Sequence, residues 1–394
     1  MPWKETSPVE ERHRLVETWL RGRVPIAQLA RTFGVSRKTA YKWITRFKAG
    51  EHAGMDDRSR ARHHQRRVPL EVRRVVLSVR RRHRTWGPVK IRDHLLEQKL
   101  FKRPPAASTI GVILKEQGLV RQRPRRERPS ASPSGHLTRA ERCNSVWTMD
   151  YKGDFRLRDG TRCYPFVVRD DFSRFILHCE AMRSTELETA KAALQRAFEV
   201  HGLPEVIRSD NGTPFAGVGL CGLSQLAVWL IRLGIRPERI TPGRPQQNGA
   251  HERANRDLKA ETVLPPARNQ RAQQRRHRRF QYVFNHVRPH QALGGAVPAS
   301  RYWASDRRLP AKLPAVTYPK HFEVRTIDNA GAIRWGGWRF FLTTALAQQP
   351  VGLEPASDGT WHLHFGMLRL GLMDLTRSHP ALITAKKTVD AFQN

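Results

Sequence analysis

The chain has 394 residues, enough for two to four domains, and 39% of them are hydrophobic, which excludes a disordered tail protein. Its 71 lysines and arginines outnumber its 35 aspartates and glutamates, so the formal net charge is +36. An excess of this size indicates a nucleic-acid partner. No membrane partner is expected, because the sequence has no basic amphipathic helix, lipid-anchor motif or apolar span.

The cysteines and the first residues bear on the compartment. The start, Met-Pro-Trp-Lys-Glu-Thr, contains no apolar signal region. Four scattered cysteines without a Cys-x-x-Cys pair are typical of a reduced intracellular protein and argue against a structural zinc site.

The first helical stretch, residues 12–48, carries two apolar stripes followed by a turn at Gly34. Ser36 is a good N-cap, and a basic helix is predicted from Arg37 to about Ala49. This order is typical of a helix-turn-helix, whose second helix enters the DNA major groove. The alternative is an ordinary three-helix core with a solvated basic face. The residues expected to point outward to DNA are Arg37, Lys38 and Lys42.

A basic run from Arg58 to Arg67 leads into further helices between about residues 69 and 120. Apolar side chains recur there at helical spacing in three segments, with Gly118 as the expected C-cap. The pattern predicts a second helix-turn-helix-like unit, with a helical spacer as the alternative. Five arginines within residues 121–128, followed by alternating Pro and Ser, predict a linker that lies along phosphate.

From about Asn144 the pattern changes to alternating strands and helices in the order typical of a ribonuclease-H-like mixed sheet. The expected strands are 145–156, 163–171, 174–182, 205–210 and 236–240, and the expected helices are 186–201, 223–234, one from Glu252 to about Thr262, and 270–286. After a Pro-rich linker at 309–319, several short strands predict a small C-terminal β-barrel.

The expected fold is therefore multidomain, with α-helical helix-turn-helix units, an α/β ribonuclease-H-like mixed-sheet core and a small β-barrel. The expected domains are a helix-turn-helix domain at 1–57, a second such unit at 58–122, a basic Pro/Ser linker at 123–140, the core at 141–305, the β-barrel at 315–376 and a tail at 377–394.

Three carboxylates stand at the ends of expected elements: Asp150 in the first strand, Asp210 at the end of the fourth, and Glu252 at the start of a helix. In this sheet order the first and fourth strands are neighbours, so the two aspartates can lie side by side under the Glu252 helix. Carboxylates this close stay ionised only if a cation neutralises them, and oxygen ligands select Mg²⁺ or Mn²⁺. Two such ions about 3.5–4 Å apart stabilise an in-line displacement at phosphorus.

Each acid also has a simpler explanation. Asp210-Asn211-Gly212 is a common turn, and Glu252 can pair with Arg256 along its helix. Asp150 can be merely an exposed acid on its strand. Asp170 and Asp171 compete with it for the catalytic role, although their place at a hairpin suits a turn. The joint order of the three acids favours the catalytic interpretation over any single motif.

The motifs around the acids are Trp147-Thr148-Met149-Asp150, Ser209-Asp210-Asn211-Gly212-Thr213-Pro214-Phe215 and Pro245-Gln246-Gln247-Asn248-Gly249-Ala250-His251-Glu252-Arg253. Together they resemble the integrase-core transposases of bacterial insertion sequences, relatives of retroviral integrases. The resemblance spans nearly the whole chain, including the tandem helical units, the Asn285–His290 motif and the C-terminal β-domain. It implies an Asp-Asp-Glu site made of Asp150, Asp210 and Glu252, with two Mg²⁺ or Mn²⁺ ions as cofactors.

The resemblance also implies a DNA transposase that binds the terminal repeats of a mobile element, cleaves their 3′ ends and transfers them to target DNA. The expected partners are double-stranded DNA, from element ends and target, and further copies of the chain in a homodimer or larger synaptic assembly. The expected compartment is the bacterial cytoplasm, in association with the nucleoid. Lys259, two turns after Glu252, matches a basic residue of the family and is expected either to contact a DNA phosphate or to be solvated. Two other hypotheses remain: a nuclease without strand transfer, and a non-enzymatic DNA-binding regulator.

The chain departs from the family at two places. Between Asp210 and Glu252 lie 41 residues, more than is usual, and the surplus is expected in a flexible loop at 216–222. His63-His64 and the scattered cysteines do not reproduce the N-terminal zinc module of retroviral integrases, so zinc is not predicted.

Overall fold

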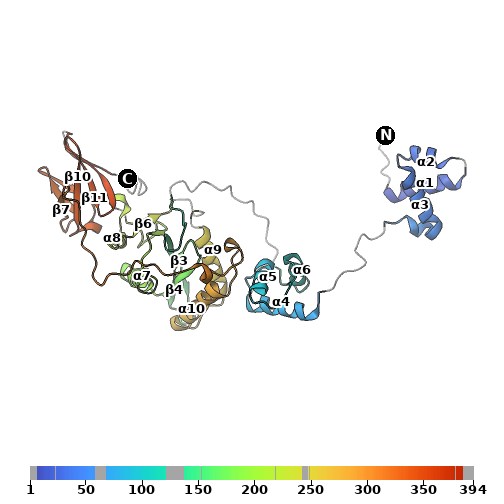
Figure 1. Cartoon of the computed structure of the whole chain (residues 1–394), viewed down its shortest axis with the longest axis horizontal. Helices are drawn as coiled ribbons and strands as arrows, with labels where there is room; N and C mark the ends of the chain where they lie inside the picture. Colours follow the sequence, from blue (N-terminus) through green and yellow to red (C-terminus); the bar gives the residue numbers. More distant parts are fainter. Residues whose placement is uncertain are drawn as a thin grey trace. The chain divides into compact units, whose positions relative to one another are not determined.

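In the computed structural model the residues described are 7–22, 24–57, 68–120, 137–151, 153–217, 219–241, 247, 249–377 and 379–384. The chain divides into two compact units, Met1–Arg67 and Val68–Asn394 (Figure 1). Residues 123–136 of the expected linker at 123–140, and residues 245, 246 and 248 of the motif before Glu252, lie outside the described residues.

The first unit is a three-helix domain. Its elements are α1 (Pro8–Leu20), α2 (Ile26–Thr32), α3 (Arg37–Gly50) and a 3₁₀ turn at Glu51–Met55. Ser36 caps α3 as expected, because its Oγ accepts the Thr39 N–H at 3.1 Å. Trp43 and Ile44 are buried with Leu29 in one core, which confirms the predicted inward face of α3.

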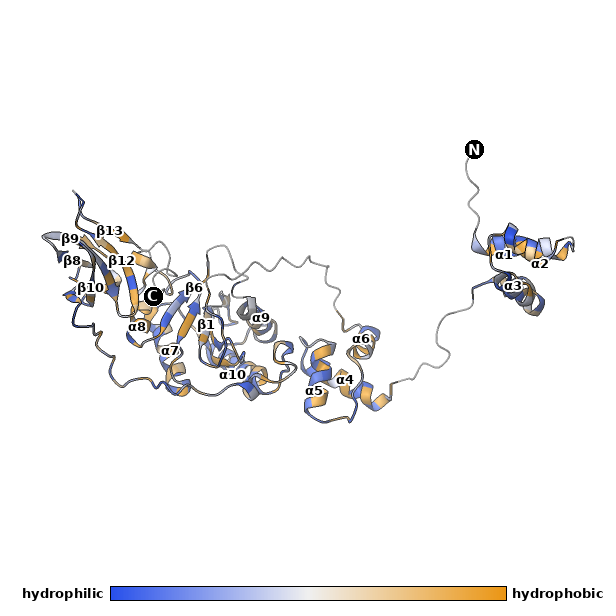
Figure 2. Cartoon of the chain, turned by 45° about the horizontal axis from the view of Figure 1, so that its top comes forward, coloured by the Kyte–Doolittle hydropathy of each residue, from blue (hydrophilic) through white to orange (hydrophobic). Residues whose placement is uncertain are grey.

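A second helical region opens the other unit. It consists of α4 (Leu70–Arg82), α5 (Pro88–Glu97) and α6 (Ala107–Glu116). Figure 2 shows apolar and polar residues sharing these helices, as expected where one face packs and the other is solvated. Their core surrounds the fully buried Trp86, and Val283 and Val287 of a later helix pack against it. The region therefore contacts the α/β core directly.

The α/β core is built on a mixed sheet, as predicted. Its strands are β1 (Val146–Tyr151), β2 (Phe155–Arg156), β3 (Arg162–Asp170), β4 (Ile176–Met182), β5 (Val206–Ser209) and β6 (Arg236–Arg239). The order is β2-β3-β1-β5-β6, with β4 paired to β3. β1 is antiparallel to β3 and parallel to β5. The predicted adjacency of the first and fourth strands is confirmed, although the expected first strand, 145–156, splits into β1 and β2.

Helices cover both faces of the sheet (Figure 1). They are α7 (Leu187–His201), α8 (Gln225–Arg232), α9 (Gly249–Leu258) with a π-helical turn at Lys259–Val263, and α10 (Gln270–His286). α7 and α8 pack on the face that carries Trp147, Met149 and Ile207. α9 and α10 pack on the opposite face, around Val167. Because strand side chains alternate, Thr148, Asp150 and Arg208 belong to the α9/α10 face.

The C-terminal unit is all antiparallel. Its strands are β7 (Glu323–Thr326), β8 (Ala332–Trp335), β9 (Trp338–Phe341), β10 (Pro350–Ser357), β11 (Thr360–Phe365), β12 (Leu368–Asp374) and β13 (Ala381–Thr384). Among the described residues they form a five-stranded sheet, β13-β12-β11-β10-β7, and a separate β8–β9 hairpin. In these described pairs the sheet's end strands β13 and β7 are not joined, so an open sheet stands where a β-barrel was expected. β13 also lies within the stretch 377–394 that the sequence assigned to a tail.

The extra residues between Asp210 and α8, which the sequence predicted to form a flexible loop at 216–222, are packed against the rest of the chain. Leu220 and Leu223 are buried in the core of the C-terminal unit, together with Ile231 of α8. The Cys221 thiol donates to the Leu370 carbonyl at 3.3 Å. Apolar side chains that would otherwise face water therefore fix this loop against the β-sheet.

Candidate active site

The two predicted aspartates lie at the same level of neighbouring strands. β1 and β5 run parallel with Thr148 opposite Arg208. Asp150 and Asp210 each come two residues later, at the ends of strands that are about 4.8 Å apart. The register thus places these two residues at the same end of two neighbouring interior strands.

Each aspartate has an identified hydrogen bond. The Asp150 Oδ2 accepts the Asn255 Nδ2 at 2.8 Å, and Asn255 is fully buried on α9. The Asp210 Oδ1 accepts the Gly212 N–H at 3.0 Å, so the turn that the sequence offered as an alternative is present. This turn also explains why β5 ends at Ser209, one residue earlier than predicted. Both carboxylates are half-buried.

Glu252 lies in the first turn of α9, which contacts β1. It precedes Asn255 by one turn and is exposed. Within the described ranges, no group of three or more His, Cys, Asp or Glu side chains is placed to hold a metal ion. The register therefore places two of the three predicted acids at the same end of neighbouring strands, and the third lies one helical turn before Asn255, which donates to Asp150.

Arg288, which the sequence did not single out, ties α9 to α10. Its buried guanidinium pairs with Asp257 at 2.5 Å and approaches Glu261 at 3.7 Å. Burial and the Arg288 charge lower the pKa of Lys90, on α5, to about 8. The same two causes lower the pKa of His290 to about 3. The Asn285–His290 motif thus lies at the junction of α9, α10 and the second helical region.

Asn285 fixes the start of this motif to the sheet. Its Oδ1 accepts the Ile176 N–H at 2.8 Å, and its Nδ2 donates to the Ile176 carbonyl at 2.9 Å. Both bonds are buried, so the end of α10 is held on β4. The motif therefore has a structural basis that its sequence spacing alone did not give.

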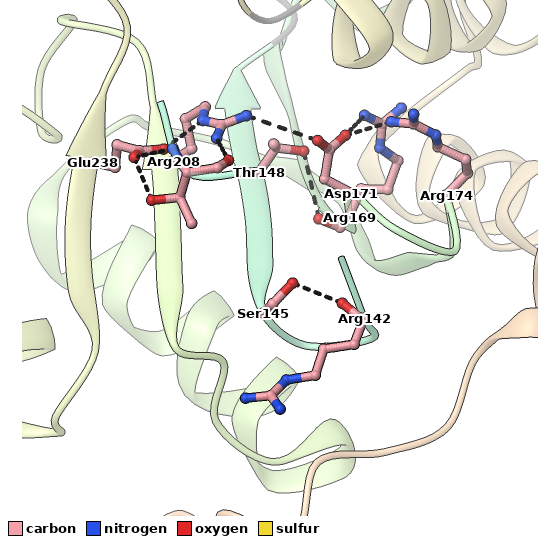
Figure 3. Close-up of polar contacts among 9 residues, drawn as sticks. Arg142, Ser145, Thr148, Arg169, Asp171, Arg174, Arg208 and Glu238 are labelled. Carbon is pink, nitrogen blue, oxygen red and sulfur yellow. Dashed lines mark hydrogen bonds and ion pairs between the residues drawn. The ribbon is translucent and has the colours of Figure 1, made fainter. Parts of the chain in front are cut away.

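An arginine–carboxylate network centred on Asp171 lies on the sheet face that carries Thr148 and Arg208 (Figure 3). The Asp171 carboxylate accepts hydrogen bonds from the guanidinium groups of Arg169 at 3.1 Å and Arg174 at 2.5 Å. It also lies 3.8 Å from the Arg208 guanidinium. Arg208 also donates to Glu238 at 2.7 Å. Asp171 is thus surrounded by cations.

Asp170, the other competing acid, has a structural role. Its carboxylate accepts the Asn144 N–H at 2.8 Å and the Ser173 N–H at 2.7 Å. This bonding agrees with the hairpin-turn interpretation of its sequence position.

The predicted DNA-facing residues are all exposed. Arg37, Lys38 and Lys42 lie on α3, away from the buried Trp43. Lys42 also reaches back, with its ammonium 4.8 Å from the Trp43 ring centroid. Lys259 begins the π-helical turn after α9 and is exposed. Their contact with DNA stays a prediction.

Family models match most parts of the chain. The matched descriptions are a helix-turn-helix domain at 11–63, a homeodomain-like domain at 39–114, an integrase core domain at 140–245 and again at 233–298, and an IS481 family transposase C-terminal domain at 322–381.

Curated relatives are bacterial and viral. The chain is 27% identical over 210 residues to an insertion element IS407 uncharacterized 31.7 kDa protein of Burkholderia multivorans, covering 52% of this chain and 70% of that protein. It is 34% identical over 128 residues to the Pol polyprotein of Feline endogenous virus ECE1, covering 32% of this chain and only 12% of the polyprotein. It also spans 7% of the Gag-Pol polyprotein of Baboon endogenous virus, at 32% identity over 127 residues, or 32% of this chain.

A solved structure of the HTLV-2 integrase catalytic core domain in complex with magnesium has 17% identity and a TM-score of 0.33, covering 41% of this chain and 99% of that one.

The fold and the matches define a multidomain chain with an integrase core domain. The chain carries tandem helix-turn-helix domains and the C-terminal domain of IS481 family transposases, and it is similar to the IS407 protein and, over about a third of its length, to retroviral Pol polyproteins. Within the described ranges, no helix has the length and apolar character needed to cross a membrane.

Proposed function

We propose that the chain is a DNA transposase that binds the terminal repeats of a mobile element, cleaves their 3′ ends and joins them to target DNA. The observation that best supports this proposal is the placement of Asp150 and Asp210 at one level of neighbouring parallel strands, with Asn255 linking Asp150 to the helix that carries Glu252. The family matches support the same reaction class, because an integrase core belongs to a polynucleotidyl transferase family.

Asp150, Asp210 and Glu252 are the proposed metal ligands. Carboxylate oxygens are the donors that Mg²⁺ and Mn²⁺ prefer, so the chemistry of this set fits such a cation. Glu252 is on the accessible first turn of α9, where its side chain is free to turn toward the sheet. When bound, two divalent ions supply activation of the attacking oxygen and stabilisation of the leaving oxygen.

The chain's own residues position these acids and the DNA. The Asn255 amide donates to one oxygen of Asp150, and the Gly212 N–H donates to one oxygen of Asp210, so each carboxylate is oriented by a hydrogen bond from the chain. The exposed basic residues of α3 are proposed to enter the major groove, and Lys259 to contact a phosphate beside the acids. Phosphoryl transfer then needs positioning and electrostatics, with no covalent enzyme intermediate.

Joining two element ends requires at least two active sites, so we propose a dimer or larger assembly on DNA. A protein whose partner is bacterial DNA would work at the nucleoid. Light scattering of the protein alone and with end DNA tests the proposed assembly, and a monomer in both conditions contradicts it.

The decisive experiment incubates the protein with Mg²⁺ and labelled DNA carrying the repeats that flank its gene. Joined products are expected from the wild-type chain and none from Asp150→Asn, Asp210→Asn or Glu252→Gln. Asp154→Asn is the matched control, because Asp154 is a half-exposed acid next to β2 whose only identified ion pair is a surface one with Arg162. Cleavage without joining would favour the nuclease, binding without cleavage the regulator, and activity in any of the three variants would overturn the site.

A further inference from the structure

A cavity of about 910 Å³ lies on the α9/α10 face of the sheet. Its wall includes Arg208, which comes two residues before Asp210 on β5, and Gln247, which comes two residues before α9. The rest comes from the end of the linker, from the turn between β3 and β4, and from the segment after the Asn285–His290 motif. Three stretches far apart in sequence thus meet on this face of the sheet, and Arg208 brings the cavity to within two residues of Asp210 along β5.

Cations dominate the charged lining. Four arginines and one aspartate line the cavity: Arg139, Arg174, Arg208, Arg301 and Asp171. Asp171 is already neutralised by Arg169 and Arg174 (Figure 3), so it offers little repulsion to an anion. The exposed side chains of Arg139 and Arg301 make no ion pair with any described residue. Two cations are therefore available to a ligand at the mouth of the cavity.

The lining also contains one aromatic ring. Phe172 is half-buried in the β3–β4 turn and belongs to none of the hydrophobic clusters among the described residues. It also makes no ring contact with a described aromatic residue. A ring that neither supports the core nor stacks on another ring is free to stack on a ligand. Arginines around such a ring are the combination that binds single-stranded nucleic acid: the cations follow the phosphates and the aromatic ring stacks a base.

We propose that this cavity binds an unpaired stretch of DNA strand next to the scissile phosphate. Its volume falls within the range of small-ligand pockets, about 300–1,000 Å³. A duplex, whose major groove alone is about 12 Å wide, does not enter such a space, whereas one strand does. The inference rests on the proposed function. It adds that this site recognises one feature of the substrate, a DNA strand separated from its complement.

The linker end is held so that Arg139 stays at the cavity. Thr138 donates through its N–H and its hydroxyl to Glu238, at 2.8 and 2.9 Å, and its carbonyl accepts Arg208 at 2.5 Å. The Arg236 guanidinium also donates to the Thr138 hydroxyl at 2.5 Å, so the residue next to Arg139 is fixed to β5 and β6 by four hydrogen bonds. This anchoring gives the cavity a wall of defined position.

Binding is tested on the full-length chain in EDTA, so that no catalysis occurs. The probe is a fluorescent oligothymidylate of about 12 nucleotides, with unlabelled duplex in excess to occupy the helix-turn-helix domains. Phe172→Ala is expected to weaken single-strand binding about 5- to 150-fold, because stacking on an aromatic side chain contributes about 1–3 kcal/mol per base. Phe172→Leu, which keeps an apolar side chain, should weaken it similarly if the ring stacks. Duplex binding should not change.

The cations are tested by salt dependence. Arg139→Gln combined with Arg301→Gln should reduce the slope of log K against log salt by about 1.4, since each phosphate contact on a single strand contributes about 0.7. Arg158→Gln is the control, because Arg158 is an exposed arginine just after β2, at the opposite edge of the sheet. A 5-iodouracil version of the probe should crosslink to the peptide containing residues 172–174.

Two results would overturn the inference: unchanged single-strand affinity in both Phe172 variants, or crosslinks confined to peptides outside the cavity. If the Phe172 variants join DNA ends normally and bind the single strand as the wild type does, strand binding in the cavity is refuted and the transposase proposal stands.

Discussion

Replacing Asn255 by leucine is expected to reduce strand transfer without a matching loss of stability. The Asn255 side chain donates to Asp150, and a hydrogen bond to a charged group contributes about 1.5–3 kcal/mol. Its Oδ1 is buried without a hydrogen-bond partner among the described residues, which costs about 1–3 kcal/mol. Leucine removes both the bond and the unpaired acceptor, so the two effects offset to within about 2 kcal/mol.

The effect on activity should be larger, because Asp150 loses the group that orients it. If the whole bond acts in the transition state, kcat/KM falls about 10- to 150-fold, since each 1.36 kcal/mol is tenfold in rate. Asn255→Asp goes further by placing a second carboxylate at 2.8 Å from the Asp150 carboxylate oxygen. Like charges raise the pKa of such a pair, so the activity of this variant should rise at higher pH than that of the wild type.

Asn285→Leu is the matched control. Asn285 is also a buried helix amide, and it bonds to both polar groups of the Ile176 backbone. The Ile176 carbonyl also accepts the Gln281 amide at 2.9 Å, so leucine at position 285 orphans the Ile176 N–H, at a cost of about 1–3 kcal/mol. Urea unfolding and a gel assay of joined DNA ends measure both variants. If Asn255→Leu destabilises the chain as much as Asn285→Leu and its activity only follows the folded fraction, Asn255 is a core residue and the reasoning fails.

Three further predictions concern the insertion after Asp210, the exposed surface of α3, and Lys90 on α5. Leu220→Ala should lower the free energy of unfolding of the C-terminal unit by about 2–5 kcal/mol, read from urea unfolding, and an unchanged midpoint would contradict its packing. Lys42→Gln should reduce the salt slope of terminal-repeat binding by about 0.9, measured by anisotropy, if the side chain meets a phosphate. The pKa of Lys90 lies at about 8, below its unfolded value, so the unfolded chain binds more protons between there and about 10.5 and stability should rise with pH across that window. Lys90→Met should flatten this rise in unfolding experiments, and an identical slope in both proteins would exclude Lys90 as its source.

Local sequence patterns predicted the elements well, because apolar periodicity reports which face of a helix or strand is buried. The helix at 186–201 and the basic helix at 270–286 appear almost as expected, as α7 and α10. The order of elements also predicted that β1 and β5 are neighbours, which places Asp150 beside Asp210. Those two acids were therefore within reach of sequence reasoning.

Residues that act through partners far away in the sequence could not be predicted from the sequence. Asn255 bonds to Asp150 across 105 positions, and nothing in the helical spacing of α9 marks it apart from other buried residues. Arg288 looked like one more cation in a chain of net charge +36, and only burial beside Asp257 distinguishes it. Phe172 lies in a turn, where periodicity gives no information. For Asn255 and Arg288 the decisive quantity is a tertiary contact, and for Phe172 it is the position of its turn in the cavity wall. A single sequence encodes neither of these locally.

The packed insertion changes how the C-terminal unit relates to the acids. The turn that holds Asp210 continues into residues 213–223, whose Leu220 and Leu223 are part of the C-terminal core. From the sheet side, Arg239 on β6 donates to the Gly222 carbonyl at 3.0 Å. The described residues 219–223 are therefore bound both to the α/β core and to the β-sheet unit. The extra length between Asp210 and Glu252 thus links these two parts of the chain in the segment that follows the Asp210 turn.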